Sequence, residues 1–330
     1  MNNKIAVLGD GSWATAIVKI LMDNGHNINW HIRLKDDIDY IKKHRKNPNY
    51  LRGVELHLDT IELSNSIQST IEGCDTVLVV IPSAYLETSL ENLPLDSFNG
   101  KFIISAVKGI VPEHYTTALE FIKNKFKLKD EQFGVISGPS HAEEIAFERL
   151  TYLTASAFNI EKAEYLAKLF ANSYVKTITS DDVYGTEYSA IMKNIMAVAS
   201  GIAHGVGYGD NFQAVLVSNA MQEAEKLIDA INPIHRDVLS SAYLGDLLVT
   251  AYSQFSRNRN FGFMIGKGYS VKTAQLEMNM VAEGYYATKS FMEMNKKFNV
   301  DIPIVHAVYN VLYEKISPVI EMKILAEKLK

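Results

Sequence analysis

The amino-acid sequence predicts an α/β fold in which a doubly wound parallel sheet is followed by an all-α C-terminal domain. Up to about Asp181, short apolar runs alternate with helical stretches, a pattern typical of parallel strands joined by helices. Beyond that point long helical segments dominate and strand-like runs nearly vanish. We therefore divide the chain into a sheet domain at residues 1–183 and a helical domain at residues 184–330.

The first predicted elements are a strand and the helix that follows it. Ile5–Leu8 is a short apolar run ended by Gly9, which indicates a strand buried on both faces. Across Trp13–Asn24 apolar residues recur at helical spacing, and Gly25 stands where a helix C-cap is expected. Further strands are predicted at 27–34, 76–81, 102–105 and 134–136, and helices of the second domain at 185–203, 213–230, 271–295 and 304–315.

The composition is that of an ordinary globular protein. Hydrophobic residues make up 47% of the 330 residues and charged residues 22%, which argues against disorder. The net charge of −5 provides no general basic surface, so no nucleic-acid partner is expected. One cysteine, Cys74, cannot form an intramolecular disulfide, and a cytoplasmic location fits. No apolar run approaches the length of a membrane span.

A glycine-rich turn follows the first predicted strand and opens a helix. The segment Gly9–Ala14 has the pattern G-x-G-x-x-A, and this context is the one that a dinucleotide-binding turn requires. Gly9 and Gly11 permit a tight turn and close backbone approach to a pyrophosphate, while the helix N-terminus offers free N–H donors. The sheet domain is therefore expected to be Rossmann-type and to bind NAD or NADP.

The second predicted strand bears on the choice between these cofactors. An NAD-specific site usually has an acidic residue about 20 residues beyond the glycines, and Asn29–Arg33 contains none. Arg33 could pair with a 2′-phosphate or stack on adenine, and a surface arginine at a strand end is the alternative. We expect NADP at least to be tolerated.

One lysine stands out in an apolar helix. Across Tyr188–Ala203, Lys193 is the only charged residue, and such a helix is expected to be buried nearly all round. Burial of an ammonium is costly, so the lysine is expected to be paired, to be deprotonated more easily than usual, or both. These are the conditions for a general base. A lysine whose stem packs while its head reaches solvent is the other interpretation.

Two further segments carry polar groups that could bind a ligand, and one carboxylate lies alone among apolar residues. Lys108 ends a strand-like run, where open α/β sheets bind ligands. The segment Ser256–Gly262 holds two arginines, which match phosphate oxygens, although alone it reads as a solvated loop. Asp246 lies among apolar residues and needs a partner, for which a lysine ammonium is the obvious candidate. Together these features suggest dehydrogenation of a small phosphorylated alcohol.

With these residues in view, the chain resembles the bacterial NAD(P)-dependent glycerol-3-phosphate dehydrogenases, from Ile5 to about Ile304. The motifs that carry the resemblance are Gly9–Ala16, Lys108–Ile110, Ser137–Glu144, Lys193–Asn194, Gly207–Asn211, Leu244–Leu247 and Ser256–Arg259. It implies a Rossmann domain followed by an all-helical domain, and interconversion of sn-glycerol 3-phosphate and dihydroxyacetone phosphate.

The resemblance also assigns roles to residues. Contacts to the dinucleotide are implied for Gly9, Gly11, Ser12, Trp13, Arg33, Tyr50, Lys108, Ala142, Arg257, Val281 and Glu283. A substrate site is implied for Lys108, Gly138, Ser140, Lys193, Asn194, Asp246, Ser256, Arg257 and Asn258. Lys193 is implied as the proton acceptor, with Asp246 and Lys108 as the other catalytic residues.

Several positions depart from the usual pattern of the family: Val107, His141, Ala190, Ile191, Asn219 and Tyr243. None removes a proposed catalytic group. They bear on the shape of the pocket, cofactor preference and feedback control, and a Tyr243 side chain near the substrate would narrow the pocket.

Two alternatives stay open. A 3-hydroxyacid or 6-phosphogluconate dehydrogenase shares the two-domain plan and a helix-borne lysine, but the Ser256–Arg259 and Lys108–Ile110 segments favour glycerol phosphate. A catalytically silent dinucleotide-binding sensor would not need Lys193 and Asp246. The scattered histidines have no metal-ligand spacing, so no metal is expected. The helical domain is a candidate for a homodimer interface.

Overall fold

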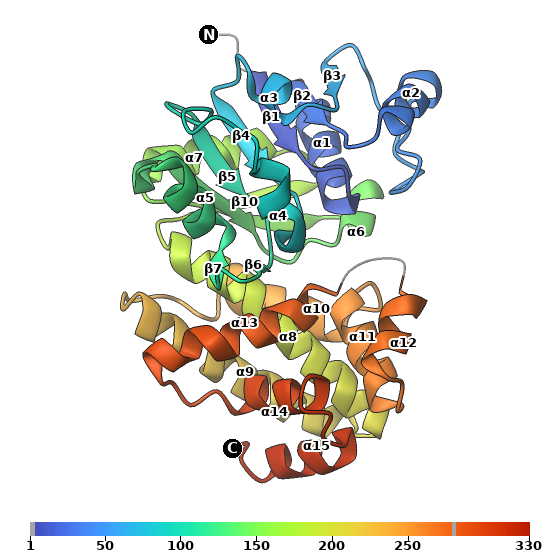
Figure 1. Cartoon of the computed structure of the whole chain (residues 1–330), viewed down its shortest axis with the longest axis vertical. Helices are drawn as coiled ribbons and strands as arrows, with labels where there is room; N and C mark the ends of the chain where they lie inside the picture. Colours follow the sequence, from blue (N-terminus) through green and yellow to red (C-terminus); the bar gives the residue numbers. More distant parts are fainter. Residues whose placement is uncertain (1–3, 279–281) are drawn as a thin grey trace. The chain divides into compact units, whose positions relative to one another are not determined.

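The computed structural model describes residues 4–278 and 282–330, and the chain divides into two compact units (Figure 1). The first unit contains the residues up to Val107 and Ala118–Val183, and the second contains Lys108–Thr117 and Tyr184–Lys330. Each unit has its own cluster of buried apolar side chains. Each can therefore be described as a body with its own core.

The segment at residues 108–117 differs from the expected division, which assigned it to the sheet domain. It forms a short antiparallel hairpin of β6 (Ile110–Val111) and β7 (Thr116–Thr117). Ile110 is buried in the apolar core of the second unit, and β6 packs against α13 (Glu283–Phe298). Because this core buries the apolar side chain of the hairpin, the segment groups with the helices although its chain neighbours belong to the sheet.

The first unit is built on a sheet with strand order β10-β9-β8-β5-β4-β1-β2-β3. Its strands are β1 (Lys4–Leu8), β2 (Asn27–His31), β3 (Ile61–Ser64), β4 (Thr76–Val79), β5 (Phe102–Ser105), β8 (Phe133–Ser137), β9 (Thr151–Ala157) and β10 (Val175–Ser180). From β1 the chain winds outward to β2 and β3, then returns to β4 on the other side of β1. The switch point where open α/β sheets bind ligands thus lies between β1 and β4.

The predicted α/β fold class is confirmed, with corrections to single strands. β8 and β9 pair in the antiparallel direction, so the sheet is mostly rather than wholly parallel. The second strand ends at His31 instead of Leu34, because Leu34 is exposed and precedes the next helix. β3, β9 and β10 were not predicted. β9 contains small and hydroxyl side chains where the other buried strands have aliphatic runs.

Helices connect the strands of the first unit. They are α1 (Ser12–Asp23), α2 (Lys35–His44), α3 (Ile67–Ile71), α4 (Ser83–Leu90), α5 (Ala118–Phe126), α6 (Ala142–Ala146) and α7 (Ile160–Phe170), with a 3₁₀ turn at Asp130–Gln132. Most of α1 is buried, because it packs against β1, β2, α6 and α7. The helix that opens at the glycine turn is therefore held on several sides.

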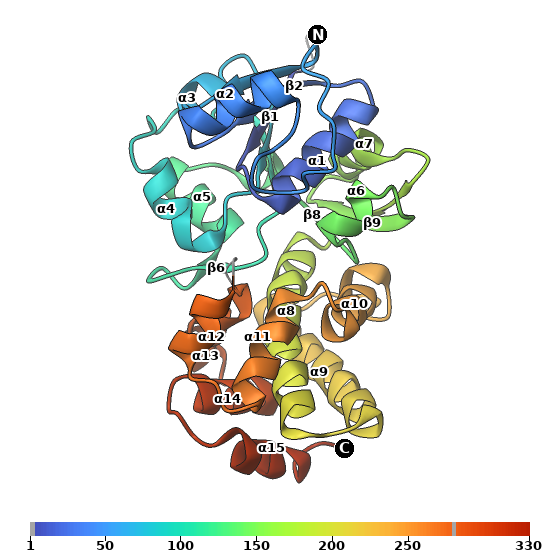
Figure 2. The same ribbon diagram turned by 90° about the vertical axis from the view of Figure 1, so that its right-hand side faces the viewer.

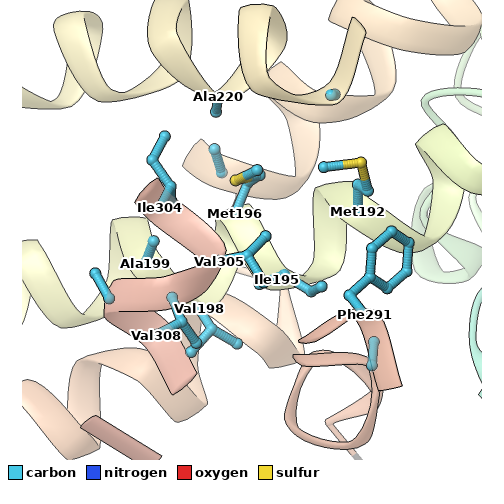
Figure 3. Packing of buried hydrophobic residues seen from close by; sticks show 14 of the residues in the cluster. Met192, Ile195, Met196, Val198, Ala199, Ala220, Phe291, Ile304, Val305 and Val308 are labelled. Atoms are coloured by element: carbon cyan, nitrogen blue, oxygen red, sulfur yellow. The ribbon is translucent and has the colours of Figure 1, made fainter. Parts of the chain in front are cut away.

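The second unit is helical apart from its hairpin (Figure 2). Its helices are α8 (Val183–Val206), α9 (Asp210–Ile231), α10 (Asp246–Tyr252), α11 (Arg257–Gly266), α12 (Val271–Glu277), α13, α14 (Pro303–Leu312) and α15 (Pro318–Ala326), with a π-helical turn at Ser241–Gly245. As predicted from its composition, α8 is buried along nearly its whole length. Apolar side chains of α8 pack in one buried cluster with side chains of α9, α13 and α14 (Figure 3).

One predicted helix of this unit is wrong. The sequence suggested a single helix over residues 271–295, whereas α12 ends at Glu277 and α13 begins at Glu283. Met278 and Ala282 have extended backbone, and the N–H of Gly284 donates to the Asn258 side chain at 2.9 Å. The start of α13 is thus fixed by a contact with α11 that a periodic pattern does not reveal.

Candidate active site

The glycine turn lies at the switch point of the sheet. Gly9 follows β1 with a φ of +128°, and a Cβ atom there would lie 2.7 Å from the carbonyl oxygen of Val80, after β4. Only glycine accommodates this conformation and this approach. At Gly11, the N-cap of α1, an added Cβ would meet no atom of the described residues within 4 Å. The open space beside a helix N-terminus fits the pyrophosphate of a dinucleotide.

The chain just beyond β2 carries Arg33, the residue expected to pair with a 2′-phosphate or to stack on adenine. The Arg33 backbone N–H donates to the Asp10 carboxylate at 3.2 Å, and its side chain is exposed. Burial lowers the pKa of His31, which ends the strand, below its ordinary value. No acidic side chain lies between Asn29 and Arg33, and Tyr50 is half-buried in the loop that follows α2.

The end of β8 supplies Gly138 and Ser140. Gly138 has a φ of +121°, and a Cβ there would lie 2.7 Å from the carbonyl oxygen of Tyr152 on β9. The Ser140 hydroxyl donates to the carbonyl of Gly138 at 2.8 Å. Ala142 is buried as the first residue of α6. Because β1, β4, β5 and β8 are parallel, these residues and the glycine turn share one edge of the sheet.

In the second unit, Lys193 and Asp246 form a buried ion pair. The Lys193 ammonium on α8 donates to Asp246 Oδ1 at the start of α10, and the side chains are 7% and 1% exposed. Lys108 Nζ lies 3.8 Å from Asp246 Oδ2. The sequence expectation that Asp246 takes a lysine partner is met, and the carboxylate faces two lysines.

This environment perturbs the acidity of the lysine. Burial lowers the pKa of Lys193 to about 7 from its ordinary value of 10.5, the Asp246 carboxylate opposes this shift and the Lys108 ammonium adds to it. An amine with a pKa near neutrality is present in both protonation states at physiological pH. Such a group can accept a proton in one direction of a reaction and return it in the other.

The main chain of Lys108 is bound by Asn194, the residue that follows Lys193 on α8. Asn194 Nδ2 donates to the carbonyl oxygen of Lys108 at 2.8 Å. The consecutive residues Lys193 and Asn194 therefore engage the Asp246 carboxylate and the main chain of Lys108, which fixes the two ammonium groups on one carboxylate.

The start of α11 brings the predicted phosphate-binding segment to the same unit. Ser256 caps this helix by accepting the Arg259 N–H at 3.3 Å, and Arg257 is exposed in its first turn. The Asn258 side chain binds Gly284, next to Glu283. A Cβ at Gly284 would lie 2.5 Å from the Asn194 carbonyl oxygen, so α8, α11 and α13 meet here.

The structure thus groups the predicted residues into two sets. The first unit contains Gly9, Gly11, Ser12, Trp13, Arg33, Tyr50, Gly138, Ser140 and Ala142. The second unit contains Lys108, Lys193, Asn194, Asp246, Ser256, Arg257, Asn258 and Glu283. Val281 lies outside the described residues. Sequence reasoning missed Gly284, whose position directly after Glu283 at a helix start was the available signal.

Tyr243, one of the departures from the family pattern, is buried in the apolar core of the second unit. It belongs to the π-helical turn that leads into Asp246. Within residues 4–278 and 282–330, no three His, Cys, Asp or Glu side chains are placed to hold a metal ion. Among the same residues, no helix is both long enough and apolar enough to span a membrane.

A Rossmann-type sheet with a glycine turn, joined to a helical unit with a buried lysine, defines a two-domain NAD(P)-dependent dehydrogenase. Two family models match the chain: the N-terminus of NAD-dependent glycerol-3-phosphate dehydrogenase at residues 4–163, and its C-terminus at residues 182–323. The chain belongs to this family. The resemblance stated from the sequence is confirmed, and with it the expectation of an oxidoreductase that uses NAD or NADP.

Individual relatives agree with the family models. The chain is 35% identical over 324 residues to glycerol-3-phosphate dehydrogenase (NAD(P)+) of Staphylococcus carnosus, covering 98% of this chain and 97% of that protein. It is 36% identical to the Staphylococcus saprophyticus protein of the same name, covering 94% of each. The crystal structure of glycerol-3-phosphate dehydrogenase from Coxiella burnetii has a TM-score of 0.90 at 26% identity and 99% coverage of both chains.

Proposed function

We propose that the chain interconverts sn-glycerol 3-phosphate and dihydroxyacetone phosphate, with Lys193 as the general acid and base. The observation that carries the proposal is the buried Lys193–Asp246 pair with Lys108 beside it. When bound, the dinucleotide supplies the two-electron chemistry: NAD(P)⁺ accepts a hydride from C2 of the alcohol, and NAD(P)H returns it to the ketone.

The proton moves through Lys193. In the oxidative direction the neutral amine accepts the proton of the C2 hydroxyl group, and the ammonium returns it to the carbonyl oxygen in reduction. Asp246 orients Lys193, and its carboxylate balances the positive charge of Lys193 when the lysine is protonated. Lys108 adds a second positive charge that stabilises an alkoxide at the same oxygen. A pKa near 7 for Lys193 supports both directions of transfer.

The phosphate of the substrate is assigned to the start of α11. Ser256, Arg257 and Asn258 stand in its cap and first turn, where N–H donors and the helix dipole favour an anion. The exposed Arg257 guanidinium supplies a bidentate partner. Asn194, which holds Lys108 in place, is assigned to the substrate site, and Gly138 and Ser140 are assigned as further substrate contacts.

The dinucleotide is assigned to the glycine turn. Gly9, Gly11 and Ser12 provide the turn and the first N–H groups of α1. Trp13 stands in the first turn of α1, Arg33 follows β2 and Tyr50 lies in the loop after α2, and the resemblance assigns all three to the dinucleotide. The resemblance adds Ala142, Lys108, Arg257 and Glu283 to these contacts. Arg33 follows β2, which contains no acidic residue, and its guanidinium supports use of NADP as well as NAD.

The direct test is oxidation of NADH or NADPH by the purified protein in the presence of dihydroxyacetone phosphate. We expect turnover with this ketone, and none with 3-oxoacids or with the unphosphorylated ketone dihydroxyacetone. Cofactor binding without any turnover would favour the silent sensor. Preferential oxidation of a 3-hydroxyacid would move the substrate assignment to that class of dehydrogenase.

A further inference from the structure

The carbonyl oxygens of Gly9, Asp10 and Gly11 each accept a hydrogen bond from a donor within the first unit. Trp30 Nε1 on β2 donates to Gly9 O at 2.7 Å, and Asn47 Nδ2 donates to Asp10 O at 3.1 Å. Gly11 O accepts both the N–H and the hydroxyl of Thr15 at 2.9 Å. Trp30 and Asn47 come from different parts of the chain, and both are buried.

These bonds determine which way the peptide N–H groups of the turn face. In a trans peptide the carbonyl of one residue and the N–H of the next point in opposite directions. A donor on Gly9 O therefore turns the Asp10 N–H away from Trp30, and a donor on Asp10 O turns the Gly11 N–H away from Asn47. A flipped peptide would instead present a carbonyl oxygen, which repels a pyrophosphate.

Asn47 uses all the hydrogen-bonding capacity of its side-chain amide. Its Nδ2 reaches Thr15 Oγ1 at 2.9 Å as well as Asp10 O. Its Oδ1 accepts the backbone N–H groups of Asn49 at 2.9 Å and Tyr50 at 3.1 Å. A side-chain amide has two donors and two acceptor sites, so the residue is saturated while only 3% exposed. It joins the glycine turn to the loop that carries Tyr50.

We propose that Asn47 is a positioning residue for dinucleotide binding, which acts by fixing the Asp10 peptide and the Tyr50 loop rather than by touching the ligand. The proposal rests on the assignment of the glycine turn as the dinucleotide site. It predicts that the two halves of the amide have different roles: the acceptor orders the loop, and the donor orients the turn.

Two variants test the donor half of the amide, which both of them remove. Asn47→Asp retains an oxygen for the Asn49 and Tyr50 N–H groups but loses the donors to Asp10 O and Thr15, and it sets a carboxylate against a carbonyl oxygen. Asn47→Ala loses both halves. We expect the Kd for NADH to rise about tenfold or more in either variant, since a buried hydrogen-bond partner is lost. The kcat at saturating NADH and the KM for dihydroxyacetone phosphate should stay within about twofold of wild type.

Binding can be measured without turnover. The chain has two tryptophans: Trp13 in the first turn of α1 and Trp30 beside Gly9. Energy transfer from them to bound NADH therefore gives the Kd directly, and thermal melting of the same samples gives the stability.

Asn172 offers a matched control. Its Oδ1 accepts the N–H groups of Tyr174 at 3.0 Å and Val175 at 2.8 Å, the same i+2 and i+3 pattern as Asn47. Its Nδ2, however, donates to Asn24 at the end of α1. Asn172→Ala should lower the melting temperature like Asn47→Ala, while its Kd for NADH remains that of wild type.

Gly11→Val tests the site itself, because an added Cβ meets no atom of residues 4–278 and 282–330 within 4 Å and would instead obstruct a ligand. If this variant binds NADH normally, the glycine turn is not the dinucleotide site. If Gly11→Val loses binding but Asn47→Asp retains a wild-type Kd, the site stands and the role of Asn47 is refuted. The role is also refuted if Asn172→Ala weakens NADH binding as much as Asn47→Ala.

Discussion

The ammonium of Lys193 and the carboxylate of Asp246 face each other between α8 and α10, and both are almost completely buried. Removal of charge from water is costly, and a buried pair seldom stabilises a protein more than apolar residues of similar size. Across residues 188–203 of α8, Lys193 is the only charged residue. The pair therefore fits a role in catalysis better than a role in folding.

We expect Lys193→Met to abolish turnover while the fold is retained. Methionine keeps the apolar length of the side chain, and Lys108 still lies 3.8 Å from Asp246 to balance its charge. Loss of a general base lowers the rate by about 10²–10⁴, and loss of alkoxide stabilisation adds to this. The measurements are turnover with dihydroxyacetone phosphate, NADH titration and thermal melting. A variant that melts normally, binds NADH and turns over within about tenfold of wild type would contradict the assignment.

The pH dependence follows from the lowered pKa of Lys193. Oxidation of glycerol 3-phosphate needs the neutral amine, so kcat/KM should rise with pH through about 7 and then level off. Reduction should show the opposite trend. The same group affects stability: between about 7 and 10.5 the unfolded chain binds more protons at this residue, so its contribution to the free energy of unfolding increases with pH. A kcat/KM profile with no inflection near neutrality would exclude Lys193 as the base.

Part of this site could be predicted from the sequence. Lys193 stands out as the one charge in an apolar run, and Asp246 as a carboxylate among apolar neighbours. Because a buried charge is costly unless it is paired, a charged residue in an apolar segment indicates a specific role. The turn at Gly9 and Gly11 was recognisable for a similar reason, since few residues tolerate its geometry. Each of these signals is a pattern among residues that are close together in the chain, and such a pattern can be recognised in a single sequence.

Contacts between residues that are far apart in the chain could not be predicted from the sequence. Asn47 lies 37 residues from Asp10, to which it donates, and nothing in its surroundings marks it. The helix predicted over residues 271–295 is divided into α12 and α13, and the Gly284 N–H at the start of α13 donates to the distant Asn258. The hairpin at residues 108–117 joins the second unit because of where Ile110 is buried. Tertiary packing decides each of these cases.

Arg257→Lys should weaken binding of dihydroxyacetone phosphate more than binding of the dinucleotide. Lysine keeps the positive charge but lacks the planar fork that matches two phosphate oxygens. The loss should be about 1–3 kcal/mol, as for a charge-assisted hydrogen bond, and steady-state kinetics with both substrates varied gives it. Arg259→Lys, two residues further along α11, is the control. An unchanged KM for dihydroxyacetone phosphate in Arg257→Lys removes this residue from the phosphate site.

Gly262→Ala should destabilise the second unit. An added Cβ at this position of α11 would overlap the carbonyl oxygen of Val198 on α8, so the two helices would have to move apart. Overpacking of this kind costs about 1–3 kcal/mol, visible as a lower melting temperature. Gly53→Ala is the control, because a Cβ there meets no atom within 4 Å in the part of the chain that the structure describes. Equal melting temperatures for the two variants would show that α8 and α11 are not in close contact.

Arg33→Asp should shift the cofactor preference toward NADH. The wild-type chain has an exposed arginine and no acid at the end of β2, so we expect both NADH and NADPH to be accepted. An aspartate at this position would accept hydrogen bonds from a ribose 2′-hydroxyl but repel a 2′-phosphate. The backbone N–H of residue 33, which donates to Asp10, is retained in the variant, so the glycine turn should keep its shape and NADH use should persist. The kcat/KM for each cofactor, measured at fixed ionic strength because the effect is electrostatic, gives the ratio directly. If the ratio of NADPH to NADH use is the same in Arg33→Asp and in wild type, then Arg33 does not lie near the ribose, and the preference must be set elsewhere in the first unit.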